Sequence, residues 1–162
     1  MATALITGAA QSAVGLPGDV DSAARNPVGM RAIGVDTTGN TAEYIYLQGV
    51  ASTIVGTVVT YDEAGVTTLI AANAKGPVAV ATGLTVASTF GWYGLQGTFL
   101  TDVVANSADN STIGRETTDG KVGDGRAAGD QIANAFQRAV TTAAAVVLCQ
   151  FDHSFVDDFM GA

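Results

Sequence analysis

Short apolar runs separated by turn residues fill the middle of the chain. In residues 42–48, Tyr44 and Tyr46 share one face of a possible strand, while Ile45 and Leu47 share the other. Successive strand residues point to opposite faces, so both faces here are apolar. The pattern predicts a strand that is covered on both sides.

β-branched and aromatic runs predict further strands downstream. A run at 54–61 leads into a turn at 62–65, and residues 66–71 can return as its hairpin partner. The other strand candidates are 78–81, 91–97 with Phe90 before it, and 99–104. Together these runs predict a β-rich fold.

Two stretches lack such periodicity. Residues 8–40 contain six glycines, two prolines and isolated apolar residues, which predicts an extended arm with turns. Residues 106–130 are dense in Asn, Asp, Ser, Thr and Gly. They predict a long polar excursion with one short strand near 112–114.

The end of the chain leaves two interpretations open. Apolar residues at i, i+4 spacing suit a helix starting near Asp130: Ile132, Phe136, Val140 and Ala144. The runs 132–138 and 145–151 could equally form two strands joined across 141–143. Residues 152–162 are acidic and aromatic, and predict a loose end or a docking segment.

Composition points towards assembly. The chain has 162 residues, of which 48% are hydrophobic and only 14% charged. It therefore cannot cover itself with the usual charged surface, and we expect it to hide apolar area in partners. No apolar run approaches the ~20 residues of a membrane span, so we expect no membrane partner.

Charge narrows the class of partner. The net charge of −8 makes nucleic-acid binding unfavourable, because phosphate neutralisation needs clustered Lys and Arg. A basic protein surface is a more natural partner. Cys149 lies in an apolar run and predicts a small buried side chain with a raised thiol pKa.

The opening residues Thr7-Gly8-Ala9-Ala10 invite comparison with a dinucleotide-binding loop. Such a loop needs glycines where this chain has Ser12 and Val14, and Pro17 would break the helix that should follow. We therefore predict no cofactor site. The lone histidine, His153, predicts a surface side chain, because no elbow presents a serine to it.

The sequence also lacks the spacing of residues that is typical of a metal site. One His and one Cys cannot form a zinc site, and residues 119–125 lack the closing Glu of a calcium loop. The sequence thus predicts no catalytic, cofactor-binding or metal-binding residues, and a protein that is not an enzyme.

Several short sequence blocks, taken in their order along the chain, resemble those of a known group of proteins. They are "TAEYIYLQG", "GTVVTYDEAG", "GPVAVATG", "FGWYGLQGTF" and "QIANAFQRAVTTAAAVVLCQF". The set resembles the small decoration, or cement, proteins that coat the heads of tailed bacteriophages. The resemblance covers roughly residues 41–151, and its most characteristic block is 91–97. The arm and the polar excursion at 106–130 are not well covered.

The resemblance implies a mostly β, compact barrel-like or sandwich-like domain, with strand–turn–strand at its end. It implies a homotrimer without cofactor that is made in the host cytoplasm and binds the major capsid protein on the outer surface of the virion. Such proteins stabilise the shell by bridging capsid subunits. The alternative is another β-rich virion component, such as a fibre, adhesin or adaptor.

These inferences divide the chain into an extended N-terminal arm (1–40), a β domain (41–151) and a tail (152–162). The predicted core consists of Tyr44, Ile45, Leu47, Val58, Trp92, Leu95, Phe136, Val147 and Cys149. The predicted contacts with capsid or neighbouring subunits are Leu16, Arg25, Val28, Met30, Arg31 and Ile33. If the arm contacts only the capsid or a neighbouring subunit, and not the β domain, a chain that begins near Thr41 should keep its fold but lose affinity for decorated phage particles.

Overall fold

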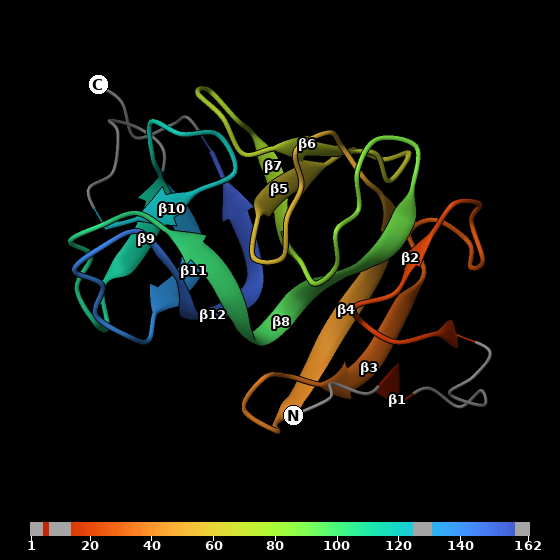
Figure 1. The fold of residues 1–162 in the computed structure, drawn as a ribbon, viewed down its shortest axis with the longest axis horizontal. Coiled ribbons are helices and arrows are strands. Elements are labelled where there is room, and N and C mark those ends of the chain that lie inside the picture. The colour runs from red at the N-terminus through yellow and green to blue at the C-terminus, as the bar shows by residue number, and fades with distance from the viewer. Residues whose placement is uncertain (1–4, 7–13, 125–130, 158–162) are drawn as a thin grey trace.

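A computed structural model describes residues 5–6, 14–124 and 131–157, which form twelve strands of one continuous sheet (Figure 1). The first six strands are β1 (Leu5–Ile6), β2 (Val20–Asp21), β3 (Arg31–Val35), β4 (Thr41–Gln48), β5 (Val58–Tyr61) and β6 (Thr67–Leu69). The others are β7 (Gly76–Ala81), β8 (Phe90–Val103), β9 (Thr112–Arg115), β10 (Val122–Gly123), β11 (Gln131–Gln137) and β12 (Ala145–Val156).

The long strand β8 joins the parts of this sheet. It pairs antiparallel with β2, β4, β7 and β12 and parallel with β10. In Figure 1 it runs as a green ribbon between the group β9–β12 on one side and β2–β4 on the other.

Strand pairing closes the sheet on itself in two places. One circuit runs from β8 through β10, β9, β11 and β12 back to β8. The other runs from β4 through β8, β7, β5 and β6, and a bridge between Val66 and Gln48 returns it to β4. The prediction of a mostly β, barrel-like domain is confirmed.

Strand β4 separates two apolar cores. Tyr44 and Tyr46 belong to the larger core, whereas Ile45 and Leu47 belong to a smaller one. All four side chains are buried. The prediction that both faces of this strand are covered is therefore confirmed.

Glycines let β8 bend around a phenylalanine. A Cβ at Gly94 would lie 2.5 Å from the ring of Phe99, so that ring occupies the space above the glycine. The Phe99 ring also packs edge-on against Tyr44 at 5.6 Å between centroids. Between them, Gly97 has φ +132°, which an L side chain rarely adopts. These contacts set the bend between the two halves of β8.

The predicted strands mostly form, with local corrections. The β5–β6 hairpin and β7 lie where the pattern placed them, but residues 54–57 stay outside β5. The runs 91–97 and 99–104 form one strand, and β9 has an unpredicted partner in β10. Strand extent depends on partners that are distant in the sequence, which a local pattern does not contain.

The end of the chain is strand–turn–strand. β11 and β12 pair antiparallel, so the helical interpretation of 130–145 is wrong. β12 continues to Val156 by pairing with β7 as well. The prediction of a loose tail is therefore wrong for residues 152–156, and residues 158–162 lie outside the described part.

Residues 14–40 are extended with turns, as predicted, but they do not stand apart from the domain. β3 pairs with β4 along its whole length, and β2 pairs with β8. The Val14 carbonyl accepts hydrogen bonds from Trp92 Nε1 and Asn26 Nδ2, both at 3.1 Å. Regular strands therefore form in this segment despite its glycines and prolines, and a chain starting at Thr41 would lose part of this packing. The Thr7-Gly8-Ala9-Ala10 stretch lies outside the described residues.

The predicted core is largely confirmed. Seven residues are at most 4% exposed: Tyr44, Ile45, Leu47, Val58, Trp92, Leu95 and Cys149. Val147 is partly buried and packs against the larger core. Phe136 is 37% exposed, so its assignment to the core is wrong. A register shift between Ala133 and Ala135 places Ala135 and Gln137 inward and turns Phe136 outward.

A buried carboxylate fixes the loop between β3 and β4. Asp36 Oδ1 accepts hydrogen bonds from Thr38 N, Thr38 Oγ1 and Asn40 N, and its Oδ2 accepts one from Thr98 N at 2.9 Å. Burial raises the pKa of Asp36, but these hydrogen bonds outweigh burial and hold the pKa below its ordinary value. The charged form therefore ties this loop to β8.

Gly94→Ala should lower the free energy of unfolding by about 1–3 kcal/mol, because the new methyl group must displace the buried Phe99 ring. Gly18→Ala is the matched control. Its Cβ would lie 3.7 Å from the nearest atom, and we expect a change within about 0.5 kcal/mol. Urea unfolding followed by Trp92 fluorescence measures both. Equal stabilities would contradict the packing of Phe99 over Gly94.

Tyr46→Phe should lower the free energy of unfolding by about 1–3 kcal/mol. The Tyr46 hydroxyl donates to Asp21 Oδ2 at 2.6 Å and accepts from Arg25 N at 3.2 Å, which fastens residues 21–25 to β4. Tyr61→Phe is the control, because the Tyr61 hydroxyl has no hydrogen bond within the described part of the chain. Thermal unfolding of the two variants should differ. A Tyr46→Phe protein as stable as Tyr61→Phe would show that the hydrogen bonds of the Tyr46 hydroxyl contribute nothing to the stability of the fold.

Asp36→Asn should destabilise the protein by about 1–3 kcal/mol at neutral pH, because the amide cannot accept all four hydrogen bonds. Since the folded-state pKa of Asp36 is lowered, its contribution is present above the unfolded-state pKa and disappears as pH falls through the folded-state pKa. The gap in stability between wild type and variant should thus narrow below about pH 4. A gap independent of pH in urea titrations would refute this role.

Candidate docking surfaces

His153 lies on the surface of β12, as predicted. Its Nε2 is 3.0 Å from Glu43 Oε2 and its Nδ1 is 3.3 Å from Asp152 Oδ1. The neighbouring Ser154 is buried and donates its hydroxyl proton to the Asn134 carbonyl. Histidine and serine thus serve separate structural contacts.

Cys149 is fully buried, as predicted. Burial raises the pKa of its thiol to about 12, which keeps it protonated and unreactive at neutral pH. No cluster of three His, Cys, Asp or Glu side chains suited to a metal ion occurs in residues 5–6, 14–124 and 131–157. The same residues contain no helix long and apolar enough to cross a membrane.

The outward face of β8 and β12 carries apolar side chains that are partly exposed. Leu148 lies opposite Leu100, and Val146 lies opposite Asp102. Paired residues share one face of a sheet, and here the opposite face holds Phe99, Cys149 and Phe151 in the core. We define the β8–β12 patch as Leu100, Phe136, Val146 and Leu148. Leu100, Val146 and Phe136 are 40%, 43% and 37% exposed.

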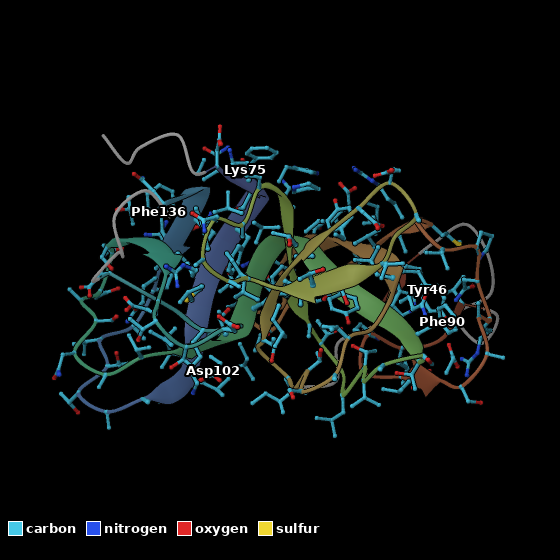
Figure 2. All side chains as sticks on the ribbon, turned by 90° about the horizontal axis from the view of Figure 1, so that it is seen from above. Tyr46, Lys75, Phe90, Asp102 and Phe136 are labelled. Atoms are coloured by element: carbon cyan, nitrogen blue, oxygen red, sulfur yellow. The ribbon has the colours of Figure 1, made fainter. Side chains whose placement is uncertain are left out.

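Charged side chains at the edges of the β8–β12 patch already have partners. Lys121 Nζ lies 3.0 Å from Asp102 Oδ1. Arg138 donates to Gln150 and Asn110, and its guanidinium lies 5.4 Å from the centre of the Phe136 ring. Asp102 lies opposite Val146 near the start of β12, and Phe136 lies opposite Gln150 near its middle; both are labelled in Figure 2. The patch is therefore an apolar strip between satisfied polar edges.

A second apolar surface lies beside β2. The Pro17 carbonyl accepts a hydrogen bond from Thr82 Oγ1, and a Cβ at Gly83 would lie 3.3 Å from Val20 Cγ2. These contacts bring the turn before β2 against the loop between β7 and β8. We define the β2 patch by its four exposed members, Leu16, Val20, Leu84 and Val86. β2 and β11 lie toward opposite ends of the long axis in Figure 1.

The predicted contact residues do not form one surface. Leu16 lies in the β2 patch, while Arg31 and Ile33 project outward from β3. Val28 packs at the β5–β6 turn, where it would meet a Cβ at Gly65, and Met30 packs against the larger core. Whether any of the six touches a partner stays a prediction.

Both predicted contact arginines pair within the chain. Arg25 NH2 lies 2.7 Å from Asp21 Oδ1, and Arg31 NH1 lies 2.9 Å from Glu43 Oε1. Both guanidinium charges are therefore balanced by carboxylates of the same chain, without an acidic group from another protein.

Sequence patterns did not single out any residue of the β8–β12 patch as a contact, and of the β2 patch they named only Leu16. In 145–151 both faces of the strand are apolar, so alternation could not tell which one faces out. The contact of the Thr82 hydroxyl with Pro17, in the turn before β2, joins segments that are 65 residues apart.

Comparison with known proteins identifies no relative of this chain. No model of a known protein family matches the chain, and neither a curated protein nor a solved structure matches it. The functional argument therefore rests on the two patches and on the sequence blocks described above.

Proposed function

We propose that this chain is a capsid decoration, or cement, protein. It binds the outer surface of a phage head and stabilises the shell by bridging capsid subunits. The proposal makes the protein a structural virion component whose partners are the major capsid protein and further copies of itself.

The observation that carries the proposal is the pair of apolar surfaces, the β8–β12 patch and the β2 patch. A protein that bridges subunits needs at least two contact surfaces, and these lie toward opposite ends of the molecule (Figure 1). Exposed apolar strips rimmed by polar side chains are typical of protein-binding sites. Two exposed apolar surfaces on one small domain support a linking role.

The domain suits a mechanical role because its strands form closed circuits. Closed circuits leave few open edges and hold the residues of the β8–β12 patch in fixed positions. Binding then requires little ordering of the chain, which favours affinity. The net charge of −8 adds attraction toward a basic partner surface.

The two patches are assigned to different partners. The β8–β12 patch is assigned to the capsid, since it extends over three adjacent strands, β8, β12 and β11. The β2 patch is assigned to a neighbouring copy, which is the contact that a homotrimer requires.

Leu100→Asp should weaken binding to phage heads by tenfold or more, because a charge within the β8–β12 patch would be desolvated without a partner. Heads of the phage that encodes this chain, assembled without it, are mixed with purified protein and sedimented. Val66→Asp is the matched control. Val66 is 39% exposed, like Leu100 at 40%, and lies in neither patch.

Circular dichroism and Trp92 emission are used to check that both variants are folded. Equal binding of Leu100→Asp and Val66→Asp would refute the assignment of the β8–β12 patch. Failure of the wild-type protein to bind heads, with binding to tails or fibres instead, would favour the alternative of another virion component.

A further inference from the structure

A polar cleft lies between β3, the β5–β6 hairpin and the start of β7. Its volume is about 690 Å³, within the range of small-molecule sites. The lining side chains used below are Arg31, Tyr61, Asp62, Glu63, Thr68 and Lys75. Neither apolar patch includes any of these residues, so the cleft is a separate feature of the surface.

Several hydrogen-bond donors that line the cleft make no hydrogen bond within the described part of the chain. Lys75 has neither an ion-pair nor a hydrogen-bond partner among the described residues, whereas Lys121 is paired with Asp102. Arg31 uses NH1 for Glu43 and keeps its other guanidinium donors. The Tyr61 hydroxyl also lacks a hydrogen bond in the described part. Lys75 extends from the surface in Figure 2.

Acceptors line the same cleft. Asp62 Oδ1 accepts from Ala64 N and Val66 N to hold the turn, which leaves its second oxygen available. Glu63 is exposed and makes no hydrogen bond with the described residues. The cleft thus offers two cations, two carboxylates and the half-buried ring of Tyr61, which packs against the smaller core.

We propose that this cleft binds a neutral saccharide. Sugar hydroxyls both donate and accept hydrogen bonds, so they suit a cleft lined by donors such as Lys75 and acceptors such as Glu63, while the Tyr61 ring supplies an apolar surface with a polar tip. The chain's net charge of −8 repels an anionic ligand, and a neutral one avoids that repulsion. The inference does not depend on capsid binding, because it concerns a different surface.

The test is an NMR titration of the full chain with maltotriose, chitotriose and, as an anionic comparison, trigalacturonic acid. One of the neutral sugars should shift backbone amide signals of residues 60–68 and 75–77 in a saturable manner. Lys75→Met should weaken that binding by tenfold or more. Lys121→Met, which changes the chain's other lysine, should leave it unchanged.

Two results would overturn the proposal. One is the absence of saturable shifts with both neutral sugars at 10 mM, or shifts with trigalacturonic acid alone. The other is equal binding by Lys75→Met and Lys121→Met, which would place the sugar elsewhere. Because the titration contains no phage heads, failure here leaves the capsid proposal to its own test.

Discussion

The fold depends on one strand, β8, and on its ability to hydrogen-bond with five others. Its first half pairs with β2, β4 and β7, and its second half pairs with β12 and β10. One strand can serve both circuits because glycines allow it to bend and let Phe99 fold over Gly94. The N-terminal segment depends on it too, through the bond from Trp92 to Val14.

The β8–β12 patch follows from the same pairing. Along the shared length of these strands, one face holds Phe99, Cys149 and Phe151 in the core, so the other face must point outward. That outward face carries Leu100 and Leu148, although solvent would favour polar residues there. An apolar surface that folding does not require is best explained by a partner, which links the architecture to the proposed decoration role.

The sequence predicts what depends on local pattern and misses what depends on distant pairing. Apolar and β-branched runs bounded by turn residues located β4, β7 and the β5–β6 hairpin, and apolar neighbours marked Cys149 as buried. It could not place residues 14–40, since Val14 meets a residue 78 positions away. Phe136 was misassigned because a register shift after Ala133 reverses the inward face of β11. The β8–β12 patch was missed because, in a strand that is apolar on both sides, the sequence does not indicate which side faces outward.

The most direct measurement is a cryo-electron-microscopy reconstruction of heads that carry this protein, at a resolution that separates strands. Our account predicts that Leu100, Val146 and Leu148 of each copy face the capsid protein and lose their exposure to solvent. It also predicts that the β2 patch meets a neighbouring copy. A reconstruction in which the β8–β12 patch faces solvent in every copy, or in which the protein is absent from the head, would contradict it.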